Sequence, residues 1–332
     1  MPQIVIISPA LAKANNGNWQ TAQRWARLLR QHYQVCIAAK WDGKRCDAMI
    51  ALHARRSADS IAAFAAAQPK SPLVVVLTGT DLYRDIQTDA NAQRSLQLAT
   101  QLVVLQASGR AELTADLRTK TQVIYQSTRT LKAVAPATRR HLNITMIGHL
   151  RDEKDPATFM RAAHLVQSQQ ARLIHIGGTL EPALGRLAAQ TEQQESRYRW
   201  LDSLPHATTR QRLKRSHLMV ICSRMEGGAN VIIEAIASGV PILASNIPGN
   251  RGMLGDDYSG YFALEDSQEL ARLIDRSIAD PAFYALLQRQ CAARAPLFST
   301  EREKTALLQL MDNLLKAPLP QPLSRKRERG AK

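Results

Sequence analysis

The sequence lacks several features that would assign it to a common class of protein. No uninterrupted apolar run among its 332 residues reaches the length of about 20 residues that a membrane-spanning helix needs. The chain enters a strand-like apolar run at residues 3–7, without the charged start and long apolar segment of a secretory signal. We therefore expect a cytoplasmic protein with no stable membrane association.

Cysteines, carboxylate clusters and aromatic residues are also few. The four cysteines, Cys36, Cys46, Cys222 and Cys291, have no metal-type spacing, and three lie in or beside apolar segments. This pattern is typical of free buried thiols in a reducing compartment. No dense group of carboxylates marks a metal site, so we expect neither a metal nor a cofactor. Without a recognised nucleic-acid motif or aromatic stacking residues, a nucleic-acid-binding role ranks last.

Acidic residues are scarce in the first half of the chain only. Residues 1–140 hold 19 Lys and Arg against 8 Asp and Glu, a net +11, whereas residues 141–315 hold 19 against 19. The last 17 residues hold 6 against 1, and the Pro-rich, charged segment 317–332 is predicted to be a disordered basic tail. The uneven charge predicts that the first half binds a strongly anionic molecule.

Short apolar runs alternate with helical stretches, the pattern of a parallel-sheet α/β protein. Strands are expected at residues 3–7, 35–38, 48–52, 73–77, 102–105, 122–125, 144–147, 173–176, 199–201, 218–222 and 242–244. The segment 127–140 has no clear period and is predicted to be a linker. We expect two doubly wound, Rossmann-like domains, 1–140 and 141–300, that face each other across a cleft.

Two glutamates eight positions apart, Glu226 and Glu234, frame a helix opened by glycines. Gly227 and Gly228 end an apolar strand-like run, and apolar residues at helical spacing begin at Asn230. Free amides at such a helix start bind phosphate, and an ionised Glu accepts two hydrogen bonds from a vicinal diol. The stretch predicts a sugar-nucleotide site, with an ordinary solvated turn as the alternative.

This stretch resembles the E-x7-E pattern of retaining glycosyltransferases of family 4, which have the GT-B fold. The resemblance implies that Glu226 contacts the donor sugar and that Glu234 contacts the ribose hydroxyls. It also implies that a helix at 301–316 crosses back onto the first domain. The segment 200–206 is similar to the family segment that lies against the nucleotide base.

A second family landmark, Gly-Arg-Leu followed by Glu-Lys-Gly, is matched by residues 148–155. His149 stands in the place of the family's diphosphate-binding Arg, Lys154 keeps the place of the Lys, and Arg151 could supply the missing cation. The expected donor-binding residues are Gly17, His149, Arg151, Lys154, Gly227, Gly228, Ala229, Asn230, Val231 and Glu234.

Three loops that follow strands of the first half carry polar side chains suited to an anionic acceptor. Paired guanidinium groups, at the expected start of a helix that runs to about residue 67, suit a phosphate-like group. Each loop alone also fits an ordinary strand end, helix start or turn. The expected acceptor-binding residues are Asn15, Asn16, Asn18, Arg55, Arg56, Thr78, Gly79 and Thr80, and the expected catalytic residues are Glu226, His53 and Asp81.

The runs 7–29, 51–60 and 77–86 resemble the selenosugar synthase family of selenoneine biosynthesis. That resemblance implies an enzyme that joins selenophosphate to UDP-N-acetylglucosamine or UDP-glucose through a carbon–selenium bond, with release of UDP and phosphate. It also implies small-molecule substrates and a pathway enzyme that supplies selenophosphate.

Other functions stay open at this point. They are a family 4 enzyme acting on another anionic acceptor such as a lipid phosphate, and a nucleotide-sugar epimerase or phosphorylase on the same fold. For the lipid acceptor, only the helix expected at 20–31 offers an apolar and basic surface, with Trp25, Leu28 and Leu29 beside three arginines. We expect that apolar face to be core.

Overall fold

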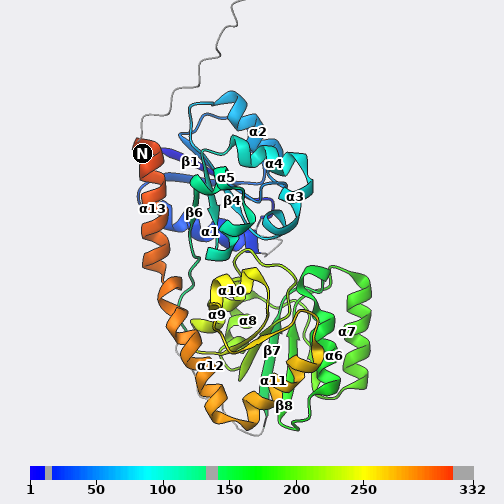
Figure 1. The fold of residues 1–332 in the computed structure, drawn as a ribbon. Coiled ribbons are helices and arrows are strands. Elements are labelled where there is room, and N and C mark those ends of the chain that lie inside the picture. The colour runs from blue at the N-terminus through cyan, green and yellow to red at the C-terminus, as the bar shows by residue number, and fades with distance from the viewer. Residues whose placement is uncertain (12–16, 132–140, 317–332) are drawn as a thin grey trace, which may run out of the picture.

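The computed structural model describes residues 1–11, 17–131 and 141–316, which form two α/β domains (Figure 1). Each domain contains a six-stranded sheet whose neighbouring strands are all parallel. The first sheet has the order β2-β1-β3-β4-β5-β6 and the second β12-β11-β10-β7-β8-β9. The reversal of strand order beside β1 and beside β7 is that of a doubly wound fold, as the sequence predicted.

The strands of both sheets agree closely with the predicted runs. They are β1 Gln3–Ile7, β2 Gln34–Ala38, β3 Ala48–Leu52, β4 Leu73–Leu77, β5 Gln101–Val104, β6 Thr121–Val123, β7 Leu142–Ile147, β8 Ala171–Ile176, β9 Tyr198–Trp200, β10 Leu218–Ile221, β11 Ile242–Ser245 and β12 Tyr261–Phe262. Only β12 was not predicted, because a two-residue strand is too short to show a pattern.

Helices connect the strands and end the described part of the chain. In the first domain they are α1 Gly17–Leu29, α2 Ala58–Ala67, the π-helical turn η2 Asp81–Asp85, α3 Ile86–Thr88, α4 Ala90–Leu98, η3 Ala107–Glu112 and α5 Ala115–Thr119. In the rest of the chain they are η4 Asp152–Lys154, α6 Pro156–Leu165, α7 Pro182–Gln194, α8 His206–Leu213, α9 Asn230–Ile236, α10 Pro248–Leu254, α11 Ser267–Ala279, α12 Pro281–Arg294, η5 Ala295–Phe298 and α13 Thr300–Lys316.

The first sheet is covered on both faces, which explains why its central strands are apolar throughout. Alternate residues of β1 enter different cores: Ile4 and Ile6 pack with α1 and α13, whereas Val5 and Ile7 pack with α2 and α4. In α1, Trp25 and Leu29 are fully buried and Leu28 is nearly so. The apolar face of α1 is therefore core, as expected. None of the described helices is long and apolar enough to cross a bilayer.

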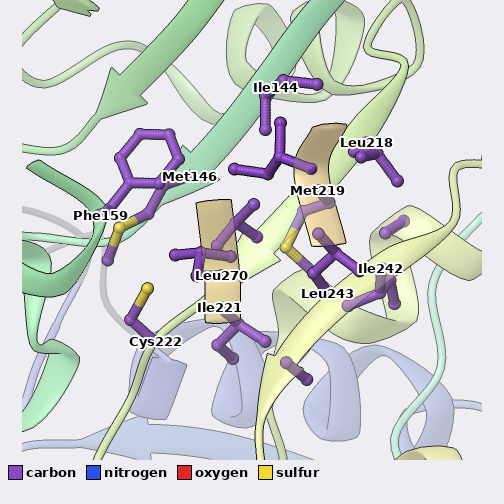
Figure 2. Close-up of a cluster of buried hydrophobic side chains, with 14 of the residues drawn as sticks. Ile144, Met146, Phe159, Leu218, Met219, Ile221, Cys222, Ile242, Leu243 and Leu270 are labelled. Atoms are coloured by element: carbon purple, nitrogen blue, oxygen red, sulfur yellow. The ribbon is translucent and has the colours of Figure 1, made fainter. Parts of the chain in front are cut away.

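The second domain has one large core built around β7, β10 and β11. Figure 2 shows their side chains packed with Phe159 of α6 and Leu270 of α11. Cys222 is buried there, and burial raises the pKa of its thiol well above the ordinary value. The expectation of burial is wrong for Cys36, which is exposed because β2 is an edge strand.

The last helix leaves the second domain and lies against the first. Figure 1 shows α12 and α13, in orange and red, along one side of both domains. Leu307, Leu310 and Met311 of α13 belong to the same buried cluster as Trp25 of α1. The first domain is thus completed by residues from the far end of the chain.

Candidate functional site

The two domains touch at backbone distance where a glycine loop of one meets a strand end of the other. A Cβ atom added to Gly227 would lie 2.3 Å from the carbonyl carbon of Thr78 and 2.6 Å from the nitrogen of Gly79. A Cβ atom added to Gly228 would lie 2.5 Å from the Cβ of Leu105. Only glycine permits this approach, so the E-x7-E loop is fitted against the carboxyl ends of β4 and β5.

Lys154 and Glu226 form an ion pair next to that contact. Lys154 ends η4, which follows β7, and Glu226 follows β10; these two strands are neighbours in the sheet. Glu226 is 8% exposed and also accepts a hydrogen bond of 2.6 Å from the hydroxyl of Ser223. The two sequence landmarks, 72 residues apart, therefore meet in one site.

The second glutamate of the pattern, Glu234, has a different partner. It lies in α9, is 6% exposed, and its Oε1 atom is 2.7 Å from Nε2 of His206. His206 is the first residue of α8 and ends the segment that resembles the base-binding region. The predicted site residues did not include His206, because its only sequence signal was its place in that segment.

His149 occupies the position at which the resemblance expects an arginine. The backbone N–H of Gly178 donates to its Nδ1 atom over 3.1 Å, so the neutral ring carries its proton on Nε2. Burial, helped by the nearby charge of Arg151, lowers the pKa of His149 below its ordinary value. His149 thus offers a neutral hydrogen-bond donor where the family pattern has a cation.

Arg151 and Glu153 link the expected donor-binding residues to the first domain. The Arg151 Nε atom lies 3.9 Å from a carboxylate oxygen of Glu153, and Arg84 of the first domain lies 3.3 Å from the other. Asp155 has φ 43°, the left-handed conformation that favours the glycine of the family pattern, and Asp tolerates it. Its side chain caps α6 by accepting from the Thr158 N–H.

His53 and Thr80 are brought together at the ends of β3 and β4. His53 is 2% exposed and has φ 73°, and its Nδ1 atom accepts from the Arg56 N–H over 3.3 Å. Its Nε2 atom lies 3.0 Å from the Thr80 hydroxyl oxygen. Burial lowers the pKa of His53. The neutral ring therefore donates from Nε2 to Thr80, whose own hydroxyl proton is left to bind another group.

Asp81 holds the same two loops together. Its Oδ1 atom accepts from the N–H groups of Thr78 and Gly79, and its Oδ2 atom accepts from that of Ala54, each over 2.9 Å. The side chain is fully buried. This geometry gives Asp81 a positioning role; its part in acid–base chemistry stays a prediction.

Arg55 and Arg56 lie in a turn and not, as the sequence predicted, at the start of a helix. Arg55 and Arg56 do not begin a helix, because the left-handed His53 turns the chain and α2 begins only at Ala58. Arg55 and Arg84 both donate to Asp85, over 2.9 and 3.2 Å. Arg84 was not among the predicted site residues.

The start of α1 borders the E-x7-E loop. A Cβ atom added to Gly17 would lie 3.7 Å from Nδ2 of Asn230. Asn18 is half-buried in the first turn, whereas Asn15 and Asn16 lie outside the described residues. In the described part of the chain, no three His, Cys, Asp or Glu side chains are grouped as metal ligands.

The chain is similar to known glycosyltransferases. A family model described as "Glycosyl transferases group 1" matches residues 129–296, half of the chain. Glycosyltransferase 1 domain-containing protein 1 of Xenopus tropicalis is 27% identical over 143 residues, which are 42% of this chain. The match spans 41% of the length of that curated relative.

Solved structures share the whole two-domain arrangement. The Anabaena protein HepE, in complex with UDP and glucose, is similar with a TM-score of 0.75 and 16% identity, covering 94% of this chain and 100% of HepE. Sucrose-phosphate synthase from Thermosynechococcus elongatus is similar with a TM-score of 0.77 and 17% identity, covering 95% of this chain and 99% of that protein. These likenesses confirm the GT-B fold.

Proposed function

This chain belongs to the glycosyl transferases group 1 family, and on that premise we propose that it transfers a sugar from a UDP-sugar to selenophosphate. The observation that carries the donor half of the proposal is the Lys154–Glu226 ion pair, at the ends of adjacent strands and beside the glycine loop that meets the first domain. The acceptor half rests on the net charge of +11 in residues 1–140 and on the three loops that resemble selenosugar synthases.

In this proposal Lys154 and Arg151 bind the diphosphate of the donor. A lysine ammonium has three N–H donors, so Lys154 can contact Glu226 and phosphate oxygens together. His149 adds a neutral donor, and the amides of residues 227–231 complete the diphosphate contacts. Glu226 accepts hydrogen bonds from the sugar, and Glu234, held by His206, accepts them from the ribose. The HepE complex with UDP and glucose supports a UDP-sugar on this fold.

The acceptor would bind at the ends of β3 and β4. Arg55, Arg56 and Arg84 provide positive charge there, and the Thr80 hydroxyl provides a directed donor. Selenophosphate already carries an anionic selenium atom and needs no base, unlike a sugar hydroxyl. The task of the protein is then to orient two anions and to stabilise the departing UDP, which cationic side chains can do without a metal.

The chemistry has two steps. Selenium attacks the anomeric carbon, the carbon–oxygen bond to UDP breaks, and UDP leaves with the electron pair. Water then attacks the phosphorus atom, the selenium–phosphorus bond breaks with its electron pair on selenium, and selenium takes up a proton from water, so that phosphate and a sugar selenol are released. If the second step occurs in the same site, His53 can accept a proton only at Nδ1, in exchange for its contact with the Arg56 N–H, while Asp81 fixes the loop.

The experiment that tests the proposal compares acceptors. The purified protein is incubated with UDP-N-acetylglucosamine or UDP-glucose and with selenophosphate, thiophosphate, phosphate or an anionic lipid phosphate. UDP release that depends on selenophosphate supports the proposal, and release with the lipid phosphate alone contradicts it. Burial of the apolar face of α1 disfavours a lipid acceptor, because α1 was the only helix that the sequence offered for a membrane surface.

A further inference from the structure

Glu303 is a buried carboxylate that the proposed reaction does not use. It lies in α13, is 1% exposed, and accepts from Arg24 Nε with both oxygens over 3.0 Å. The indole N–H of Trp25 donates to it over 2.9 Å, and so does the backbone N–H of Ser127. A single carboxylate therefore joins the last helix, α1 and the segment that follows β6.

Gln126, the residue before Ser127, continues this network into the second domain. Its side chain is buried, and the amide orientation that gives the nitrogen acceptors and the oxygen a charged donor points the oxygen at Arg24 Nη2, 2.9 Å away. The nitrogen then donates to the carbonyl oxygen of Gly228 over 3.1 Å and to Oδ1 of Asn230 over 3.2 Å. Both acceptors belong to residues 226–230, which we call the donor loop.

The result is one buried chain of contacts: Glu303 to Arg24, Arg24 to Gln126, and Gln126 to the donor loop. It runs from the C-terminal helix, through the first domain, to the loop that carries Glu226. Fixing the carbonyl of Gly228 also fixes its planar peptide, so the N–H of Ala229 must point away from Gln126. Buried polar groups in such a chain lose their partners together when one member is removed.

We propose that Glu303, Arg24 and Gln126 form an interdomain brace that positions the donor loop for a nucleoside diphosphate sugar. The inference rests on the proposed function in taking this loop as the donor site. Gln126 is a positioning residue, because it contacts the loop and acts on the substrate only through it. The C-terminal helix is by this account part of the donor-binding apparatus, although it lies on the other domain.

The chain offers a matched control for the attachment of α13. Tyr33 donates from its hydroxyl to Oδ1 of Asp312 over 2.5 Å, which also ties α13 to the first domain. Neither residue contacts the donor loop in the hydrogen bonds of the described chain. Tyr33→Phe therefore weakens the docking of α13 without cutting the brace.

The test measures hydrogen–deuterium exchange of the full chain without nucleotide, followed by calorimetry with UDP. In Gln126→Met, which keeps the side-chain volume, we expect amides of peptides covering 226–236 to exchange about tenfold faster, the effect of one or two lost hydrogen bonds. The UDP dissociation constant should rise by a similar factor. Tyr33→Phe should leave the exchange rates and the UDP dissociation constant within about twofold of wild type, because the hydrogen bond that it removes lies outside the brace.

Unchanged exchange of the 226–236 peptides in Gln126→Met would overturn the brace. Gln126→Asn, which keeps the polarity but is one carbon shorter, provides the second variant if Gln126→Met does not fold, and the same exchange result is expected. Wild-type protein that fails to bind UDP would instead contradict the proposed function, while the exchange result would still decide about the brace.

Discussion

Lys154 and Glu226 are joined across the ends of β7 and β10, so that the cation of one sequence landmark and the carboxylate of the other form a single unit. Their side chains are 18% and 10% exposed. A pair that is mostly withdrawn from water keeps a fixed geometry, and removal of either partner leaves the other charge without compensation. Lys154 and Glu226 therefore depend on each other, and a substitution of one also changes the position and charge balance of the other.

The first prediction concerns this pair. Lys154→Met and Glu226→Gln should each lower kcat/KM for the UDP-sugar by about 100-fold, because each removes a substrate contact and misplaces the other residue. The double variant should lose much less than the product of the two, since coupled residues are not additive. Steady-state UDP release measures all three. Additive losses would mean that the two residues act independently.

The second prediction concerns the backbone contact between the domains. Gly227→Ala should abolish most of the activity, because its Cβ atom would lie 2.3 Å from backbone of Thr78 and would force the domains apart. Gly43→Ala is the matched control: Gly43 has φ 84° and nothing within 4 Å of the added atom. It should lower the free energy of unfolding by about 1 kcal/mol and leave kcat/KM unchanged.

The third prediction separates donor from acceptor binding. Arg56→Ala should raise KM for selenophosphate several-fold, about 1 kcal/mol of lost charge interaction, and should leave KM for the UDP-sugar unchanged. Arg94→Ala, which removes an exposed arginine of α4, is the control with the same change of charge and should leave both KM values unchanged. Initial rates at varied concentrations of each substrate give the two constants. A rise confined to the donor KM in Arg56→Ala would mean that the acceptor site has been misplaced.

The fourth prediction concerns the dependence of stability on pH. His175 is fully buried between the Tyr198 hydroxyl and the Gly148 carbonyl oxygen, and burial lowers its pKa to about 4. Between that value and the ordinary pKa of about 6.5, the unfolded chain binds the proton that the folded chain excludes, so stability falls as the pH falls. From pH 7 to pH 5 this group alone should cost about 2 kcal/mol.

Denaturant unfolding of wild type and His175→Gln at the two pH values checks this sign. The variant is expected to be less stable at pH 7, because it disturbs the contacts of Tyr198 and Gly148, but to lose about 2 kcal/mol less on acidification. An equal loss in both proteins would place the titrating group elsewhere.

Much of the fold was predictable because buried parallel strands are short apolar runs, and β3 and β4 are buried along their whole length. The prediction of the donor site depends on one continuous stretch, because Glu226 and Glu234 lie eight positions apart. Contacts between distant segments were not. Arg24 and Glu303 are 279 residues apart, and the sequence around neither residue predicts which residue it contacts.

The residues that we expected to bind an acceptor show where the sequence misleads. Arg55 and Arg56 fit a helix start, but the left-handed His53 keeps them in a turn. Asp81 has the chemistry of a base, yet three backbone N–H groups occupy its oxygens. Residue type alone does not show whether a polar side chain forms hydrogen bonds within the protein or binds a substrate.

We propose that this protein attaches selenium to the anomeric carbon of a UDP-sugar. The most direct measurement is mass spectrometry of the products formed from UDP-N-acetylglucosamine or UDP-glucose and selenophosphate, with UDP quantified in the same samples. We expect a sugar that carries one selenium atom, formed in equal amount to UDP and about 100-fold more slowly with Lys154→Met. UDP release without selenium in any sugar product, or no UDP release with either donor, would contradict it.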